Sequence, residues 1–284
     1  MEEILFTKMH GIGNDYIYIH CPGGVPSEIS ELSIEMSRRH VAVGSDGIIL
    51  ILPSDNADFM MRIFNADGSE ARMCGNGIRC VGKFVYDRRL TEKTTLRIDT
   101  LSGIRTLTLH PGSDGMIESV TVDMGHPSTT DSVLGAAEMI EYPLAVTGGE
   151  VKVTAVSMGN PHGVVFVGSL ESVDVHRLGR ELELHPVWPD RANIEFAEVT
   201  SDHSVSMRVW ERGSGETLAC GTGACATAEA AVLTGRCHWP VDVRLLGGTL
   251  TIDKSPSGTI LMTGPAETVF EGRYTRRRSP NNNN

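Results

Sequence analysis

The fold is decided by two segments, Met73-Cys74-Gly75-Asn76-Gly77 and Ala219-Cys220-Gly221-Thr222-Gly223, each of which leads into a helical run. Both read Cys-Gly-x-Gly, and Cys220 follows Cys74 by 146 residues. The same offset aligns four other pieces of the chain: Arg62-Ile63-Phe64 with Arg208-Val209-Trp210, Glu70 with Glu216, Gly13-Asn14 with Gly159-Asn160, and Gly47 with Asn193. A constant offset over such distant pieces indicates a duplicated domain rather than a chance match among common glycines.

Two domains also agree with the length, because 284 residues are close to twice the roughly 150 residues of a typical domain. We expect an N-terminal half at 1–121, to which about 266–278 return, a C-terminal half at 122–265, and a disordered tail at 279–284. A tandem pair is expected to pack face to face, with the repeated segments lining a cleft, since clefts between domains are common ligand sites.

The apolar pattern predicts a mixed α+β fold. Strands are expected at 96–109, 151–156, 204–209 and 249–252, where apolar and polar residues alternate. Helices are expected at 29–39, 77–88, 171–178 and 223–233. Many short strands with few helices argue against the regular βαβ alternation of a parallel sheet.

The charge and composition exclude several classes of protein. With 25 Lys and Arg against 36 Asp and Glu, the net charge is −11, so the chain is a poor binder of nucleic acid and of anionic membranes. The longest apolar runs, such as 47–52, are far shorter than the roughly 20 residues of a membrane span, and 1–11 lack a secretory signal pattern. Six cysteines are too few for a disulfide scaffold. We therefore expect a soluble, cytoplasmic protein that binds neither nucleic acid nor membranes.

Each Cys-Gly-x-Gly segment places a thiol at the start of a helix. The glycines permit tight turns, and the unpaired N–H groups of a helix N-terminus bind carboxylates or phosphates. The same end of a helix lowers the pKa of a thiol. We therefore predict a reactive cysteine beside an anion site in each half.

Two such units facing one another favour inversion of a stereocentre. A substrate carboxylate would lie between the helix ends, one thiolate would remove the α-proton, and the other thiol would return a proton on the opposite face. Because an α-proton is very weakly acidic, the helix-end donors must stabilise the charge of the carbanion. This chemistry needs no cofactor and no metal, and the chain has no phosphate-binding glycine motif between a strand and a helix.

Other fates for the cysteines remain open. Those outside the repeated motif are expected to be buried and inert: Cys21, Cys80, Cys225 and Cys237. Cys220 and Cys225 have zinc-like spacing but no convincing third and fourth ligands nearby, so we expect no metal site. A disulfide between Cys74 and Cys220 would be the oxidised, inactive form of a close thiol pair.

Several motifs follow one another along the chain in a fixed order. They are Lys8-Met9-His10-Gly11-Ile12-Gly13-Asn14-Asp15, Asn65-Ala66-Asp67-Gly68-Ser69-Glu70, Met73-Cys74-Gly75-Asn76-Gly77-Ile78-Arg79-Cys80, Met158-Gly159-Asn160-Pro161-His162-Gly163, Arg191-Ala192-Asn193-Ile194-Glu195-Phe196, Trp210-Glu211-Arg212-Gly213 and Glu216-Thr217-Leu218-Ala219-Cys220-Gly221-Thr222-Gly223. Together they closely resemble the diaminopimelate epimerase family, from residue 5 to about residue 272. The resemblance implies two pseudo-symmetric α+β domains, each a rolled, mostly antiparallel sheet around a central helix. It also implies interconversion of LL- and meso-2,6-diaminopimelate without pyridoxal phosphate, a step in lysine and peptidoglycan precursor synthesis.

The resemblance further implies roles for individual residues. Cys74 and Cys220 would be proton donor and proton acceptor, in an order that reverses with the direction of reaction, and His162 and Glu211 would help set their protonation. The residues that would hold the reacting α-carboxylate through helix-end N–H groups are Gly75, Asn76, Gly221 and Thr222. Arg212 would bind the distal carboxylate through two parallel hydrogen bonds from its guanidinium. The distal ammonium and carboxylate would be held by Asn14, Asn65, Asn160 and Asn193.

Two further positions bear on specificity and assembly. Many family members carry Gln where this chain has Gly47, so one contact to the distal end of the substrate is missing here. Phe270 matches an aromatic position linked to homodimer formation in the family. Two alternatives stay open: a related racemase for another amino acid, which would keep both thiols, and a non-catalytic binding or redox protein, which would be expected to lose a thiol or a helix-end glycine.

Overall fold

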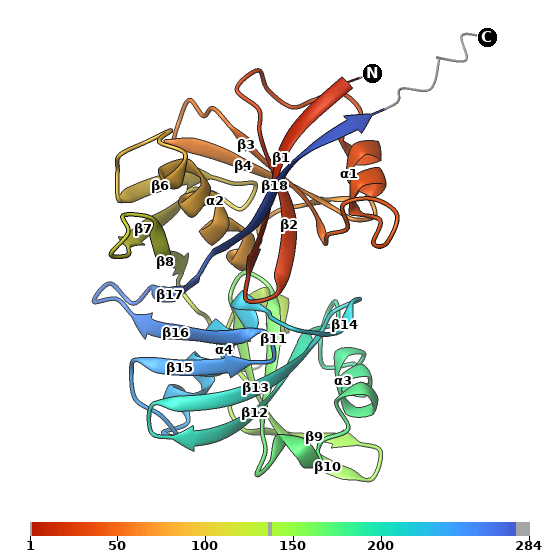
Figure 1. Ribbon diagram of the computed structural model, residues 1–284. Helices are drawn as coiled ribbons and strands as arrows, with labels where there is room; N and C mark the ends of the chain where they lie inside the picture. The colour runs from red at the N-terminus through yellow and green to blue at the C-terminus, as the bar shows by residue number, and fades with distance from the viewer. Residues whose placement is uncertain (1, 136–137, 277–284) are drawn as a thin grey trace, which may run out of the picture. The chain divides into compact units, whose positions relative to one another are not determined.

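The computed structural model describes residues 2–135 and 138–276. The chain forms two compact units, Met1–Val120 with Pro265–Asn284 and Thr121–Gly264. Figure 1 shows the C-terminal strand β18 (Glu267–Arg276) returning beside the N-terminal strand β1 (Glu2–Gly11), with which it pairs. The tail expected at 279–284 lies outside the described residues.

Two helices and a set of short strands make up the first unit. Besides β1 and β18, its elements are β2 (Asn14–His20), α1 (Ile29–Ser37), β3 (Gly47–Leu52), β4 (Phe59–Asn65), β5 (Glu70–Ala71), α2 (Gly75–Asp87), β6 (Thr95–Asp99), β7 (Arg105–Pro111) and the start of β8 (Ile117–Gly125). β2 pairs with β3, and β4 with β6, in parallel, whereas most of the other pairs are antiparallel.

The second unit repeats this pattern. Its elements after β8 are η1 (Ser132–Leu134), β9 (Tyr142–Val146), β10 (Gly149–Ser157), β11 (Pro161–Phe166), η2 (Leu170–Ser172), α3 (Val175–Glu183), β12 (Asn193–Ser201), β13 (Ser204–Glu211), β14 (Gly215–Thr217), α4 (Gly221–Leu233), β15 (Val241–Leu245), β16 (Gly248–Lys254) and β17 (Ile260–Pro265). Here β11 and β12, and β13 and β15, are the parallel pairs.

The offset seen in the sequence reappears in the element boundaries. α1 and α3 begin and end 146 residues apart, and so do α2 and α4. A bidentate ion pair is also repeated, because Arg62 binds Glu70 in the first unit and Arg208 binds Glu216 in the second. These correspondences confirm the predicted α+β fold of two pseudo-symmetric halves.

Each unit folds its strands around one helix. α4 contacts β10, β11, β12, β13, β15 and β16, and its fully buried residues are small: Ala224, Ala226, Ala228, Ala230 and Ala231. Alanine is the best helix former, and its methyl group lets strands approach closely on many sides. α2 contacts β1, β2 and β7 and buries larger side chains, Ile78, Val81 and Val85, each worth about 1.5–3 kcal/mol.

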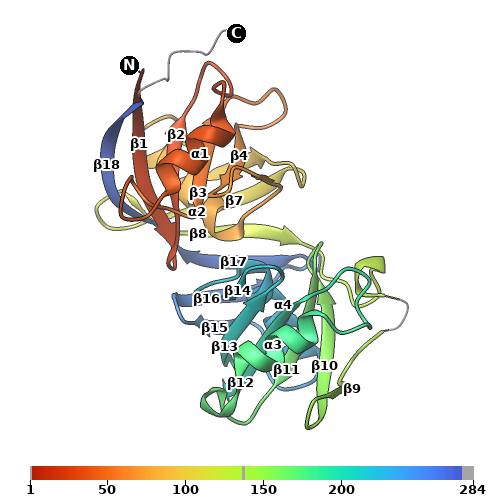
Figure 2. The ribbon, with the colours of Figure 1, turned by 90° about the vertical axis from the view of Figure 1, so that its right-hand side faces the viewer.

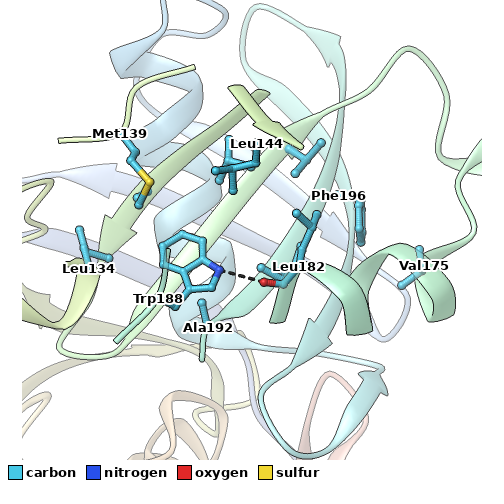
Figure 3. Close-up of a cluster of buried hydrophobic side chains, with 12 residues drawn as sticks. Leu134, Met139, Leu144, Val175, Leu182, Trp188, Ala192 and Phe196 are labelled. Carbon is cyan, nitrogen blue, oxygen red and sulfur yellow. Dashed lines mark hydrogen bonds between the residues drawn. The ribbon is translucent and has the colours of Figure 1, made fainter. Parts of the chain in front are cut away.

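The remaining helix of each unit covers the other face of its strands, as Figure 2 shows for α1 and α3. In the first unit Ile48 and Leu50 belong to the core cluster that includes α1, whereas Ile49 lies against Gly77 of α2. Successive side chains of a strand point to opposite faces, so β3 is buried on both sides. Figure 3 shows the equivalent cluster of the second unit, in which the Trp188 indole donates a hydrogen bond to Leu182 O at 2.9 Å.

Several predicted elements differ from the structure in their bounds. The strand expected at 96–109 is two strands, β6 and β7, because Gly103 has φ +92° and turns the chain between them. The helix expected at 171–178 begins only at Val175, where Asp174 Oδ1 caps it by accepting a hydrogen bond from Arg177 N at 3.0 Å. α2 and α4 begin two residues earlier than expected, directly after the cysteines.

No helix within residues 2–135 and 138–276 has the length and apolar character needed to cross a membrane.

Candidate active site

Cys74 and Cys220 hold the same place in their two units, as the residues that cap the N-termini of α2 and α4. Cys74 Sγ accepts a hydrogen bond from Gly77 N at 3.3 Å, and Cys220 Sγ accepts one from Gly223 N at 3.4 Å. Both cysteines have the extended backbone of an N-cap residue. Each sulfur is thus held against the helix-end N–H groups that bind anions.

The first turn of each helix lies directly against the strand behind it. A Cβ on Gly77 would lie 2.5 Å from Ile49 Cδ1, and a Cβ on Gly223 would lie 2.7 Å from Glu195 Oε1. A side chain at either position would therefore have to push Ile49 or Glu195 aside.

The Cys220 thiol lies in a buried, acidic environment and is 7% exposed. Burial raises the pKa of Cys220 well above its ordinary value, and the charges of Glu211 and Glu195 raise it further. Hydrogen bonds from Thr222 and from Gly223 N lower this pKa, but by less. The helix end therefore acts on the pKa of Cys220 in the expected direction, but burial and the two acids outweigh it, so the net shift is upward. Cys220 is therefore a protonated thiol at neutral pH.

Glu211 is the acid beside Cys220. It is the last residue of β13, and it accepts a hydrogen bond from Thr217 on β14. Burial raises the pKa of Glu211, and the charge of Glu195 adds to this, whereas hydrogen bonds from Thr217 and Cys220 lower it. A carboxyl group that is hydrogen-bonded to a thiol is well placed to exchange a proton with it.

His162 connects this thiol to a second buried acid. The ring is fully buried on β11, with Nδ1 2.7 Å from Glu195 Oε1 and Nε2 3.2 Å from Asn160 Oδ1. Asn160 Nδ2 donates to Thr222 Oγ1 at 3.5 Å, and Thr222 Oγ1 lies 3.6 Å from Cys220 Sγ. The second unit thus brings the predicted residues His162, Asn160 and Thr222 together around Cys220.

Arg212 and Asn193 meet where β13 ends and β12 begins. Asn193 Oδ1 accepts a hydrogen bond from Arg212 N at 3.0 Å, and Asn193 Nδ2 donates to Pro161 O at 3.0 Å. The Arg212 guanidinium donates to the backbone oxygen and to Oδ2 of Asp190, at 2.8 and 3.0 Å. Asp190 is highly exposed, so this ion pair is weak.

The turn that carries Arg212 is held by Glu183, the last residue of α3. Glu183 Oε1 accepts from Gly213 N at 2.9 Å, and Oε2 accepts from Trp210 Nε1 at 2.7 Å. With two oxygens satisfied by groups on either side of the turn, Glu183 fixes its path. The sequence analysis did not single out this residue.

In the first unit, Asn14 is the polar neighbour of Cys74. Cys74 Sγ donates to Asn14 Oδ1 at 3.2 Å, and Asn14 Nδ2 donates to Asp46 Oδ2 at 2.8 Å. Arg39 Nη2 pairs with Asp46 Oδ1 at 3.0 Å. The predicted Asn14 therefore contacts the predicted Cys74, and Asp46 and Arg39 hold it there.

The other two predicted asparagines of this unit make local contacts. Asn76 is buried in the first turn of α2, and its Oδ1 accepts from Arg79 Nη1 at 3.0 Å. The same guanidinium donates to Gly75 O at 3.3 Å, so a fully buried cation lies beneath this helix end. Asn65 Nδ2 donates to Ser69 Oγ at 3.0 Å within its own turn. Substrate contacts from Asn65 and Asn76 stay a prediction.

The structure shows the surroundings of two other residues that the sequence analysis singled out, Gly47 and Phe270. At Gly47 a Cβ would lie 2.2 Å from Phe64 O, so this backbone has no room for a side chain. Phe270 on β18 is 45% exposed, and its ring packs edge-on against Phe6 with centroids 5.9 Å apart.

Glu195 is a site residue that the sequence analysis missed. The feature that could have pointed to it is its place within β12, whose residues 193–197 are all buried. An acid on such a strand has to have a polar partner.

The cysteines outside the repeated motif are buried, as expected, and all six cysteines of the described chain are thiols rather than disulfides. Within the described ranges, no three His, Cys, Asp or Glu side chains are grouped to hold a metal ion.

The chain matches the sequence model of the diaminopimelate epimerase family over residues 6–130 and 154–269. A diaminopimelate epimerase from Acetivibrio thermocellus is 49% identical over 272 residues, covering 94% of this chain and 97% of its own. One from Bacteroides thetaiotaomicron is 51% identical over 271 residues, covering 95% and 97%. One from Methanococcus maripaludis is 49% identical over 272 residues, covering 94% and 98%.

Solved structures with distant sequences share the fold. The PhzF-family phenazine biosynthesis protein of Bacillus anthracis is 20% identical, with a TM-score of 0.72 over 97% of this chain and 100% of its own. A hydroxyproline epimerase from Agrobacterium vitis is 17% identical, with a TM-score of 0.70 over 96% of this chain and 91% of its own.

Proposed function

The chain belongs to the diaminopimelate epimerase family, and from this premise we propose that it interconverts LL- and meso-2,6-diaminopimelate by a two-cysteine acid–base mechanism. It is an isomerase, and its reaction belongs to lysine biosynthesis and to the supply of peptidoglycan precursors.

The observation that supports the mechanism most is the repeated cap. Each half of the chain holds one sulfur on the first N–H groups of a helix, in the same geometry. Inversion needs two acid–base groups of one kind that exchange roles, and the duplication supplies such a pair. The adjacent helix-end N–H groups would stabilise the charge that develops on the α-carboxylate when the α-proton leaves.

In each direction one thiolate removes the α-proton, and the electron pair of the broken C–H bond is delocalised onto the α-carboxylate. The other thiol then gives its proton to the α-carbon on the opposite face. For Cys220 to act as the base it must first lose its own proton, and Glu211, which is hydrogen-bonded to it, is the acceptor we propose. Thr222, Gly221, Gly75 and Asn76 would bind the α-carboxylate. The distal end would be held by Asn14, Asn65, Asn160 and Asn193, and by Arg212 once the distal carboxylate displaces Asp190.

We also propose that the protein is a homodimer in the cytoplasm. Three exposed apolar side chains lie on the paired strands β1 and β18: Leu5, Val269 and Phe270. Exposed apolar side chains of this kind favour association with a second copy. A cytoplasmic location is favoured because both thiols have to stay reduced.

Chiral chromatography of LL-diaminopimelate incubated with the reduced enzyme tests the function. We expect the meso isomer to accumulate with wild type and at least about 10²-fold more slowly with Cys74→Ala or Cys220→Ala. Lysine and proline serve as control substrates. Inversion of a control substrate without inversion of diaminopimelate would move the specificity elsewhere, and an alanine variant that inverts diaminopimelate within about tenfold of the wild-type rate would contradict the two-base mechanism.

A further inference from the structure

Glu195 is a fully buried acid at a position where the first unit has an apolar residue. The offset of 146 pairs it with Ile49, which is also fully buried, and each of the two lies against the first turn of the helix that follows the cysteine. An apolar side chain is therefore sufficient for the fold at this position. Because burying a carboxyl group costs free energy, Glu195 has a role that packing does not explain.

The carboxyl group is only half satisfied. Glu195 Oε1 lies 2.7 Å from His162 Nδ1, whereas Oε2 is buried without a hydrogen-bond partner among the described residues. A buried carboxyl oxygen without a partner is costly. With Oε1 2.7 Å from Nδ1, this geometry favours a hydrogen shared between these two atoms.

The contact at His162 Nε2 fixes the position of the second hydrogen of the Glu195–His162 pair. Asn160 Oδ1 can only accept, so the hydrogen of the 3.2 Å contact has to be on His162 Nε2. The Asn160 amide is oriented by its other end, which donates to Thr222 Oγ1 at 3.5 Å. The Thr222 hydroxyl hydrogen is then left for Cys220 Sγ, 3.6 Å away. Every donor from His162 onward points toward the sulfur.

We propose that Glu195 is a positioning residue for Cys220, which keeps the hydrogen of His162 on Nε2 and thereby keeps the chain His162–Asn160–Thr222 donating toward the sulfur. With an ionised Glu195 and a neutral ring, the single hydrogen would move to Nδ1. Asn160 would then have to turn over, and its amide would no longer donate to Thr222.

The hydrogen bond from Thr222 to Cys220 affects the reaction, and this step rests on the function proposed above. A donor on the sulfur stabilises the thiolate, which is the form that removes an α-proton, and the hydrogen bond from Thr222 does lower the pKa of Cys220. The acids that face the thiol, Glu211 from β13 and Glu195 from β12, act in the opposite direction through their charges. A proton kept on the Glu195–His162 pair reduces the second of these effects and preserves the donor.

Two substitutions separate this role from packing. Glu195→Gln keeps a donor for Nδ1, because its amide N–H can replace the shared proton, whereas Glu195→Ile installs the residue that the first unit uses. We expect E195Q to retain kcat within about threefold of wild type and E195I to lose about tenfold or more, with KM changed less than about twofold in both, since Glu195 has no predicted substrate contact. Thermal unfolding is the control for structure. Because E195I leaves His162 Nδ1 buried without its partner, we expect it to melt below wild type but to stay folded at the assay temperature, and E195Q to melt close to wild type.

The nitrogen NMR spectrum of the His162 ring, assigned with His162→Gln, is the direct readout and needs no substrate. We expect a hydrogen on Nε2 in wild type and in E195Q. Equal losses of kcat in both variants, or a loss in neither, would overturn the proposal, as would a wild-type ring whose only hydrogen is on Nδ1. If wild type failed to invert diaminopimelate, the NMR result would still decide the role of Glu195, so the two failures are distinguishable.

Discussion

Replacing each capping cysteine by serine and by alanine should separate the folding role of the cap from the chemistry of the thiol. In both units the sulfur accepts a hydrogen bond from the N–H three residues later, at 3.3 Å for Cys74 and 3.4 Å for Cys220. Serine keeps an acceptor at that place, but its hydroxyl is a far weaker acid than a thiol. Alanine removes both the acceptor and the acid.

The size of each effect follows from the geometry. Loss of an N-cap acceptor costs about 0.5–2 kcal/mol, and in a domain of this size about 1 kcal/mol lowers Tm by roughly 3 °C. Cys74→Ala and Cys220→Ala should therefore melt about 2–6 °C below wild type, and the serine variants within about 2 °C of it. Removing one acid–base group should lower kcat by about 10²- to 10⁴-fold in all four variants.

Calorimetry and chiral chromatography on the same preparations measure both effects. Cys21→Ala is the matched control, because Cys21 is buried in the core of the first unit and has no expected role in catalysis. A serine variant with kcat within tenfold of wild type would refute the acid–base role of that cysteine. Serine and alanine variants that melt together would refute the capping role.

Three further predictions concern recognition, alkaline stability and assembly. Arg212→Lys loses the planar fork for the distal carboxylate, so KM for diaminopimelate should rise about 10- to 100-fold in initial-rate kinetics; an unchanged KM contradicts that role. Burial raises the pKa of Cys80 to about 11, so the folded state holds this proton more tightly than the unfolded state. The free energy of unfolding should therefore be steady below about pH 9 and fall, by up to about 3 kcal/mol, as the pH rises through about 11; Cys80→Ala should flatten this fall in urea titrations, and equal slopes would contradict it. Phe270→Lys should yield monomers in sedimentation, whereas Leu246→Lys, at an exposed site of the second unit, should not; a dimeric F270K protein would argue against the β1–β18 interface.

The duplicated fold was predictable because a repeat constrains many positions at once. Cys74 and Cys220 are enough to fix the offset, and the boundaries of α1 and α3, and of α2 and α4, follow it. The break between β6 and β7 was not predictable from periodicity, because the alternation of apolar residues continues on both sides of the turn at Gly103. The turn itself is made by Gly103, which has positive φ and whose N–H donates to Thr100 O at 3.0 Å.

The chemical environment of the thiols was less predictable than their position. The local motif correctly indicates a cysteine at each helix start. The raised pKa of Cys220 depends on burial and on Glu195 and Glu211, which come from two other strands, so a rule about helix ends alone gives the wrong direction. Glu183 and Asp46 likewise act through contacts with residues distant in the sequence, which no short motif contains.

The central claim is that two thiols, rather than one base, invert the α-carbon. Its most direct test is the early time course of LL-diaminopimelate with the reduced enzyme in D₂O, followed by proton NMR. A base that returns its own proton leaves the substrate unlabelled, whereas the opposite thiol delivers deuterium from solvent. We predict that newly formed meso isomer carries deuterium at the inverted centre while the remaining LL substrate stays protonated. Deuterium entering the remaining LL substrate as fast as the meso product would contradict the two-thiol account.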